Sequence, residues 1–365
     1  MKPRLLVFEF RMLGDAIMSL PFIRSASAAF QIHVTCTPKA AAVYRNHLPD
    51  EQIIPWTPGW LKDERSVESE SDLRTGPFLK SIQALKPDIA VCAWADARTH
   101  YLLARSGAKR RIGFPMTAKN FFASHLGWRK RQIIAGAFLN VAGGLSLARP
   151  LLTEKLQRHD YRQHHVEDWR QLAEVVEVEW KPDLPWTKTD PAALSNGTRE
   201  MLAGLKREGK RIWLVHPGAR LPEHRWPQES FARVIREVFP PNEIQTLIIQ
   251  PPDLELSDEL KQLSPIVGTE DLPQLFALLA EVDGVLCNDT GVSHAAAAVG
   301  RRVVSVFTAG EPDWFAPWGS RDLAVRQDVC PHHPCLGRCV MPSVICRDAV
   351  TVEQVKEKVL QALNG

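Results

Sequence analysis

The sequence lacks an apolar run long enough to cross a membrane. A membrane-spanning helix needs about 18 or more consecutive apolar residues, whereas the most apolar stretch, QIIAGAFLNVAGGLSLA at 132–148, contains Asn140 and is rich in glycine. We do not expect the N-terminal stretch to be a secretory signal, because Glu9, Arg11 and Asp15 divide the apolar core of roughly 7–15 residues that such a signal needs. We therefore expect a soluble, cytoplasmic protein.

Cysteine is too sparse and too clustered for a disulfide-stabilised secreted domain. Seven cysteines occur in 365 residues, and four of them lie between 330 and 346. Neither sign of charge is in large excess, since 45 Lys and Arg against 42 Asp and Glu give a formal net charge of +3. This balance neither requires a nucleic-acid partner nor excludes an anionic substrate. With 45% hydrophobic and 24% charged residues, the composition is that of a globular protein rather than a disordered one.

Short β-type runs alternate with helical segments along most of the chain. This pattern is typical of an α/β protein whose parallel sheets are covered by helices. The length suits two domains of about 100–200 residues each, and the proline-containing segment at 180–197 separates two similar halves. We predict a first domain at 1–182, a second at 198–348 and a C-terminal helix at 349–365. The predicted strands are 4–10, 32–36, 87–94, 110–114, 211–216, 244–250, 282–287 and 301–307, and the clearest helices are 227–238, 290–299 and 351–363.

The loop RMLGD at 11–15 follows the first predicted strand. It brings Asp15 to the carboxyl edge of the sheet, where α/β proteins bind ligands, and Gly14 lets the backbone approach such a ligand. Pro21 falls about two turns into the helix that begins near Asp15 and is expected to kink it. The alternative is that Asp15 is simply the N-cap of this helix.

The loop HPGARLPEHRWP at 216–227 follows another predicted strand. It gathers His216, Arg220, His224 and Arg225 at the carboxyl end of that strand. Cationic donors suit an anionic group, and Arg binds phosphate in a bidentate manner. The alternative is a solvated basic loop.

The segment VLCNDTGVSHAAAAVG joins a third strand to a helix of small residues through Asp289, Thr290 and Gly291. Free N–H groups and the dipole at a helix start form an anion site. Thr290 and Ser293 add hydroxyl donors to it. His294 is more simply explained as a half-buried histidine than as a catalytic one.

Four motifs resemble glycosyltransferase family 9, the ADP-heptose:lipopolysaccharide heptosyltransferases. They are LGDAIMSLP, RRIGF, HPGA…RWP and NDTGVSHAAAAVG, in the order and at about the spacing of that family. The resemblance implies a GT-B fold, with two Rossmann-like domains whose parallel sheets face each other across a cleft. It implies transfer of a heptose from ADP-heptose to the inner core of lipopolysaccharide with inversion, without a catalytic metal, by an enzyme that acts on a glycolipid at the inner-membrane surface.

The resemblance also assigns roles to residues. Asp15 would be the general base that takes the proton of the acceptor hydroxyl. Arg225 and the helix start at Thr290 and Gly291 would stabilise the charge on the leaving ADP, and Asp289 would face the donor sugar or shape its loop. The implied donor-binding residues are His216, Gly218, His224, Arg225, Glu255, Asp289, Thr290, Gly291, Ser293 and His294.

Three positions depart from the family pattern. His224 stands where the family usually has Lys, and Glu9 stands where many members have Lys or Arg, with Arg11 displaced by two residues. The segment QPPDLE at 250–255 replaces a turn that usually contains Gly-Gly. These departures leave two alternatives open: a family 9 transferase that uses another nucleotide sugar or a protein acceptor, and a nucleotide-sugar-binding protein without turnover.

A basic run lies in the first half of the chain. Arg129, Lys130 and Arg131 follow Trp128, a combination suited to a phosphorylated glycolipid at a membrane surface. With Arg11, they are the candidate acceptor-binding residues. The alternative is an ordinary solvated charge run.

The cysteine cluster follows the spacing C-x4-C-x3-C-x6-C at Cys330, Cys335, Cys339 and Cys346. Soft ligands at this density suit a structural zinc or iron ion. The spacing is looser than that of ordinary zinc sites, so the alternative is a set of free thiols in a structural loop.

Overall fold

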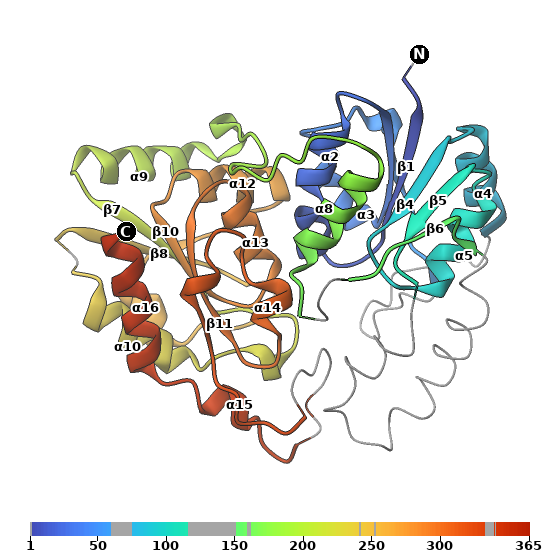
Figure 1. The fold of residues 1–365 in the computed structure, drawn as a ribbon. Coiled ribbons are helices and arrows are strands. Elements are labelled where there is room, and N and C mark those ends of the chain that lie inside the picture. The colour runs from blue at the N-terminus through green and yellow to red at the C-terminus, as the bar shows by residue number, and fades with distance from the viewer. Residues whose placement is uncertain are drawn as a thin grey trace. The chain divides into compact units, whose positions relative to one another are not determined.

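The computed structural model describes residues 2–59, 75–115, 151–158, 162–240, 242–251, 253–332, 339 and 341–365. The chain forms two compact units, Met1–Asp183 and Leu184–Gly365. Each unit contains one six-stranded sheet, and all the paired strands are parallel. Figure 1 shows helices on both faces of each sheet.

The sheet of unit 1 has the order β3-β2-β1-β4-β5-β6. Helices α2, α3 and α8 cover one face, and α4 and α5 cover the other (Figure 1). The central strands are apolar on consecutive positions because both faces are covered. The elements of unit 1 are β1 (Arg4–Glu9), α1 (Leu13–Met18), α2 (Leu20–Ala26), β2 (Gln31–Cys36), α3 (Pro38–Tyr44), η1 (Asp50–Gln52), β3 (Ile53–Pro55), α4 (Thr75–Ala84), β4 (Ile89–Cys92), α5 (Ala97–Arg105), β5 (Arg110–Gly113), β6 (Glu154–Lys155) and α8 (His165–Val175).

The sheet of unit 2 has the order β12-β11-β10-β7-β8-β9, the same winding as unit 1. Its core includes Trp213, Trp226 and Phe231, and helix α16 packs its buried Val355 and Val359 into it. The elements of unit 2 are η4 (Pro191–Ala193), α9 (Asn196–Arg207), β7 (Arg211–His216), η5 (Pro222–His224), α10 (Gln228–Val238), β8 (Ile244–Ile249), α11 (Asp258–Leu263), β9 (Ile266–Val267), α12 (Leu272–Ala280), β10 (Gly284–Asn288), α13 (Gly291–Ala298), β11 (Arg302–Phe307), α14 (Pro312–Phe315), η6 (Arg321–Leu323), β12 (Ala324–Arg326), α15 (Ile345–Asp348) and α16 (Val352–Asn364).

The order of strands places one switch point in each sheet. In unit 1 the chain winds one way from β1 through β2 to β3 and the other way from β4 to β6, so the switch lies between β1 and β4. In unit 2 it lies between β7 and β10. Open α/β sheets bind ligands outside the carboxyl ends of the strands at this point. The loops after these four strands are therefore where functional side chains are expected.

The start of the first helix differs from one sequence expectation. Helix α1 begins at Leu13 with Met12 as its N-cap, so Asp15 is the third residue of the helix and the N-cap interpretation of Asp15 is wrong. The helix is interrupted at one residue, Ser19: α1 ends at Met18 and a second helix, α2, begins at Leu20 with Pro21 in its first turn.

The chain passes from unit 1 to unit 2 within the proline-containing segment. Residues from Leu184 onward pack in unit 2, where the backbone N–H of Trp186 donates to the carbonyl of Ala298 at 2.7 Å. Within the described ranges, no helix is both long and apolar enough to span a membrane.

Candidate active site

The switch point of unit 1 gathers charged side chains from three segments. Glu9 ends β1, Arg11 lies in the loop that follows, and Asp15 lies in the first turn of α1. Trp94 and Asp96 follow β4, the strand on the other side of the switch. Because β1 and β4 are parallel neighbours, their carboxyl ends bring these residues to the same edge of the sheet.

Asp15 is a nearly buried carboxylate whose side chain turns back onto the loop. Its exposed fraction is 9%, and its Oδ2 accepts a hydrogen bond from the backbone N–H of Met12 at 3.0 Å. Burial raises the pKa of Asp15 above its ordinary value, while the charges of His165 and Arg11 and the Met12 N–H lower it. The carboxylate is thus poorly hydrated, a condition that strengthens a carboxylate as a proton acceptor.

Glu9, the departure from the family pattern, is fully buried beside Asp15. The backbone N–H of Arg11 donates to its Oε1 at 2.8 Å, while its Oε2 makes no hydrogen bond of standard geometry within the described part of the chain. Burial, followed by the charge of Asp15, raises the pKa of Glu9 to about 8. Glu9 is therefore mainly neutral at pH 7, and its carboxyl group adds little negative charge beside Asp15.

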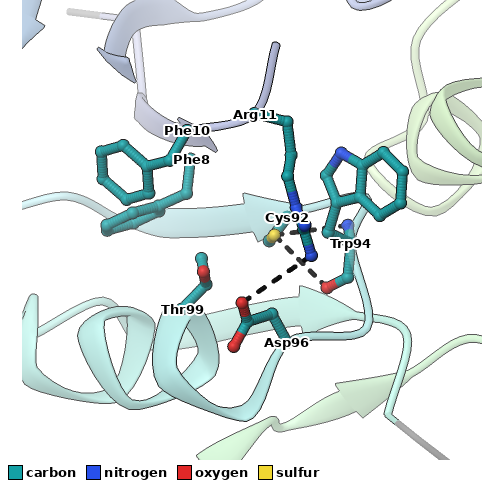
Figure 2. Close-up of a pocket in the computed structure, with 7 residues that line it drawn as sticks. All are labelled: Phe8, Phe10, Arg11, Cys92, Trp94, Asp96 and Thr99. Carbon is teal, nitrogen blue, oxygen red and sulfur yellow. Dashed lines mark hydrogen bonds and ion pairs between the residues drawn. The ribbon is translucent and has the colours of Figure 1, made fainter. Parts of the chain in front are cut away.

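Arg11 lies against an aromatic ring and a carboxylate. Its guanidinium carbon is 4.7 Å from the ring centroid of Trp94, and its Nη2 is 3.9 Å from Oδ2 of Asp96. Figure 2 shows Arg11 between these two groups in a pocket. The pocket is lined by Phe8, Phe10, Arg11, Cys92, Trp94, Asp96 and Thr99.

Asp96 is held mainly by a second arginine. Its carboxylate accepts bonds from the side chain of Arg98 at 2.9 and 3.0 Å, and the backbone N–H of Arg98 donates to it as well. Burial alone would raise the pKa of Asp96, but the Arg98 hydrogen bonds and charge outweigh it and lower the pKa. Arg11, with 38% of its side chain exposed and its Nη2 3.9 Å from Asp96, keeps an accessible positive charge at the pocket.

A histidine and an aspartate that sequence reasoning missed complete this edge. Helix α8 begins at His165, whose Nδ1 is 3.0 Å from Oδ2 of Asp168, and its ring lies 4.4 Å from that of Trp94. The available signal was the spacing of three residues, since such residues share a face where the segment is helical, but this helix was not among those predicted. The influence of His165 on Asp15 depends on tertiary structure, since the two residues lie far apart in the sequence.

The switch point of unit 2 contains the residues predicted to bind the donor. His216 ends β7 nearly buried, and burial lowers its pKa to about 4, so its ring is neutral at pH 7. The expectation of a cationic donor at His216 is therefore wrong. Gly218 follows, and a Cβ there would lie 2.7 Å from Cβ of Pro251, so only glycine fits this approach of two loops.

Arg225 is held on two sides. Its Nε donates to the carbonyl of Ala219 at 2.8 Å, and its Nη2 pairs with Oδ2 of Asp253 at 2.6 Å. The side chain is 14% exposed. His224 is half-buried just before it, at the end of η5. Arg225 thus already holds an anionic group, the carboxylate of Asp253.

Glu255 lies apart from these donors. Its side chain is highly exposed, and Oε1 is 3.8 Å from Nζ of Lys261. Its backbone carbonyl accepts a hydrogen bond from Gln228. The contacts of Glu255 are therefore those of a surface residue.

The loop after β10 is fastened to the loop after β7 by Asn288, which sequence reasoning also missed. The buried amide of Asn288 donates from Nδ2 to the carbonyl of Pro217 at 2.8 Å and accepts at Oδ1 from the N–H of Trp226 at 3.0 Å. It fixes the neighbour of Arg225 relative to the start of α13. Its place within the NDTG motif was the available signal.

The start of α13 presents its free amide groups at this edge. Thr290 is the N-cap, and its buried Oγ1 has no hydrogen-bond partner in the portion that the structure describes. Ser293 uses its hydroxyl locally, donating to the Thr290 carbonyl at 2.7 Å. Asp289 lies against Gly310, where a Cβ would come 2.2 Å from its Oδ2, and His294 is buried within the helix. The Thr290 hydroxyl and the amide groups of a helix start are donors of the kind that bind anions.

Several predicted residues lie outside the described residues. They are Arg129, Lys130 and Arg131 of the basic run and Cys335 of the cysteine cluster. Cys330 and Cys346 are buried free thiols, and Cys339 is a partly exposed one. Burial raises the pKa of Cys346, and the thiols of Cys330 and Cys339 raise it further. The residues with described positions form no group of three or more His, Cys, Asp or Glu side chains that would hold a metal, so the metal site stays a prediction.

Comparisons with known proteins agree on one family. A family model described as glycosyltransferase family 9 (heptosyltransferase) matches residues 135–344. Lipooligosaccharide heptosyltransferase 2 of Haemophilus influenzae is 25% identical over 120 residues, a match that spans 30% of this chain and only 35% of that relative's length.

Solved structures extend the likeness to the whole chain. The ADP-heptose lipopolysaccharide heptosyltransferase II of Escherichia coli is 17% identical with a TM-score of 0.63, covering 100% of this chain and 99% of that one. A second E. coli heptosyltransferase, solved with ADP, is 16% identical with a TM-score of 0.65, covering 98% and 99% of the two chains. At these identities the likeness shows the fold, so the predicted GT-B fold class with two Rossmann-like units is confirmed.

Proposed function

The chain belongs to glycosyltransferase family 9, the heptosyltransferase family, and from this premise we propose that it moves a heptose from ADP-heptose to the inner core of lipopolysaccharide with inversion. Unit 1 binds the acceptor and unit 2 binds the nucleotide sugar. The observation that carries the proposal is the pair of switch-point sites: a poorly hydrated carboxylate, Asp15, in one unit and an unsatisfied helix start at Thr290 in the other.

Asp15 acts as the general base. It takes the proton of the acceptor hydroxyl while that oxygen forms a bond to the anomeric carbon and the bond from that carbon to the diphosphate breaks. Inversion follows from this single displacement. Neutral Glu9 supports the role, because an uncharged neighbour does not oppose the ionisation of Asp15.

The donor site stabilises the leaving ADP. Negative charge grows on the β-phosphate as the bond breaks, and fixed donors that are already oriented lower the barrier. The amide groups at the start of α13, the Thr290 hydroxyl and Arg225 supply these donors. His216 and Gly218 shape the adjoining loop, where the neutral ring and the missing side chain allow a close approach. The chemistry assigned to these residues requires no metal.

The acceptor contacts are Arg11 and the predicted basic run Arg129, Lys130 and Arg131. A phosphorylated glycolipid core offers anionic groups that guanidinium donors bind well. The solved relatives named for ADP-heptose and for ADP support the choice of donor, and the lipooligosaccharide relative supports the choice of acceptor. We place the enzyme in the cytoplasm, at the inner face of the inner membrane.

A transfer assay tests the proposal. Purified protein is given a panel of ADP- and UDP-sugars and a lipopolysaccharide core truncated before its heptoses. We expect product with ADP-heptose, and in D15N a loss of transfer by several orders of magnitude with ADP binding retained. The control is D50N, because Asp50 is an exposed carboxylate of the same unit that pairs with Arg45.

Three outcomes would contradict parts of this reading. Preference for a UDP-sugar would replace the donor. Full transfer by D15N would remove Asp15 as the base. Nucleotide-sugar binding without transfer to any lipid or protein acceptor would favour a binding protein. The ion pair between Asp253 and Arg225 supports this alternative, because it occupies the arginine that would stabilise the leaving ADP.

A further inference from the structure

Three charged side chains meet beside the pocket of unit 1, and the proposed function uses only one of them, Arg11. Arg11 lies in the loop after β1, whereas Asp96 and Arg98 lie at the start of α5, the helix that follows β4. The side chains of Arg11 and Arg98 are 38% and 44% exposed, and that of Asp96 is 6% exposed. One nearly buried carboxylate therefore lies close to two partly exposed guanidinium groups.

The two arginines share the Asp96 carboxylate unequally. Its Oδ1 accepts hydrogen bonds from the backbone N–H and the Nε of Arg98 at 2.9 and 3.0 Å, and its Oδ2 accepts from Nη2 of Arg98 at 2.9 Å. This is the two-point geometry in which a guanidinium group binds a carboxylate well. Nη2 of Arg11 is 3.9 Å from the same Oδ2, a contact that Figure 2 shows and that is too long for a hydrogen bond.

Asp96 needs a cation where it lies. Its carboxylate is nearly buried, and burying an unpaired carboxylate is costly. It is also fixed in place, because Asp96 is the N-cap of α5 and its side chain accepts from a free amide at the helix start. Without the Arg98 guanidinium, the Asp96 carboxylate would attract Arg11, whose Nη2 is already 3.9 Å away.

Arg11 is held at present by an aromatic ring instead. Its guanidinium carbon lies 4.7 Å from the ring centroid of Trp94. A guanidinium group that stacks on a ring face keeps the N–H donors at its edge for a planar anion. In this position Arg11 can bind an anionic group directly, whereas an Arg11 paired with Asp96 would first have to break that pair.

We propose that Arg98 is a positioning residue for Arg11: by occupying the Asp96 carboxylate, it leaves the positive charge of Arg11 available to an anionic group of the acceptor. The proposal rests on the proposed function, because it gives Arg11 the role of an acceptor contact. Arg98 itself is assigned no contact with the acceptor. With Asp96 neutralised by Arg98, the cluster presents its one net positive charge at Arg11.

The kinetics of transfer to the truncated lipopolysaccharide core test this proposal. In R98M, Asp96 pairs with Arg11, so we expect KM for the acceptor to rise up to about fivefold, the range of a partly exposed ion pair, with kcat nearly unchanged. In the double variant R98M/D96N the competing carboxylate is gone, so we expect KM to return to the wild-type value. The D96N change keeps the helix cap, because Asn is also a good N-cap.

Two further variants sharpen the comparison. R98K keeps a cation beside Asp96 without the two-point geometry, so its KM should lie between those of wild type and R98M. R98Q retains a polar side chain and serves where R98M folds poorly. The control is R105M, because Arg105 is an exposed arginine of the same helix whose guanidinium carbon lies 5.9 Å from the ring centroid of Tyr101. R105M removes one positive charge from α5 and should leave KM unchanged.

A second measurement needs no acceptor. Phenylglyoxal modifies accessible guanidinium groups, and mass spectrometry of the digested protein measures the rate of modification at Arg11. We expect Arg11 to react severalfold more slowly in R98M than in wild type or R105M, because Asp96 then covers its donors. The wild-type rate should return in R98M/D96N.

The outcomes separate this proposal from the proposed function. A rise in KM that persists in R98M/D96N would show that Arg98 binds the acceptor itself or supports the fold, and would overturn the proposal. Equal reactivity of Arg11 in wild type and R98M would overturn it as well. An unchanged KM in R11Q would instead remove Arg11 from the acceptor site, a failure of the proposed function that the reactivity of Arg11 does not share.

Discussion

Replacing Glu9 by Gln should change how folding stability depends on pH. Glu9 is fully buried, and its pKa is raised from the ordinary 4.5 to about 8. Between these two values the unfolded chain releases the Glu9 proton while the folded chain keeps it, so the free energy of unfolding falls as pH rises from about 4.5 to about 8. Each unit of pKa is about 1.4 kcal/mol, so the full loss is roughly 5 kcal/mol as an upper estimate.

Gln is a close mimic of the protonated side chain and does not titrate. Its amide oxygen accepts the bond from the Arg11 N–H that Oε1 accepts now at 2.8 Å. We expect E9Q to resemble wild type in stability near pH 5 and to be more stable by several kcal/mol at pH 9. Urea unfolding followed by tryptophan fluorescence at pH 5, 7 and 9 measures this difference. The control is E51Q, because Glu51 is an exposed carboxylate of the same unit.

The reasoning fails if the stability difference between E9Q and wild type is the same at all three pH values. Glu9 would then ionise alike in the folded and unfolded chain, and its burial would not control its charge. A stability advantage of E9Q that grows with falling pH would contradict the reasoning directly, because it would mean that the folded state favours the ionised form of Glu9.

Two further predictions concern unit 2. D253N frees Arg225 from an exposed ion pair worth up to about 1 kcal/mol, so we expect ADP to bind up to about fivefold more tightly by calorimetry. The control is D258N, because Asp258 is an exposed carboxylate beside Lys261. Equal or weaker ADP binding by D253N would show that Asp253 does not compete with ADP for Arg225. N288A leaves the Pro217 carbonyl and the Trp226 N–H buried without their amide partner. We therefore expect the free energy of unfolding to fall by about 2–4 kcal/mol in a denaturant titration. An unchanged unfolding midpoint would show that Asn288 does not fasten the two loops.

The central strands could be predicted because each buries both faces and so forms a continuous apolar run. All eight predicted strands are present, with ends that differ by at most two residues. The strands β3, β6, β9 and β12 were missed because they have two or three residues and lie toward the edges of the sheets. Such short segments carry too little pattern to distinguish them from loops.

The position of the candidate residues could also be predicted, but their charge states and partners could not. A residue at the carboxyl end of a parallel strand must lie at one edge of the sheet, which is how Asp15, His216 and Thr290 were found. The neutral state of Glu9 depends on burial from every side, and the pairing of Arg225 with Asp253 joins residues 28 positions apart. No local pattern contains such information.

Glu9 stands where many family members have a basic residue. This is compatible with the proposal that Asp15 is the base, because the ionisation of Asp15 depends on the charges around it rather than on residue type. A second ionised carboxylate beside Asp15 would make its proton harder to lose, whereas a protonated Glu9 adds no charge at pH 7. The positive influence that a basic residue would have supplied comes instead from Arg11, two positions along the chain, and from His165 in α8. The same reasoning sets the limit of the arrangement, since above about pH 8 Glu9 ionises and a second buried negative charge then lies beside Asp15.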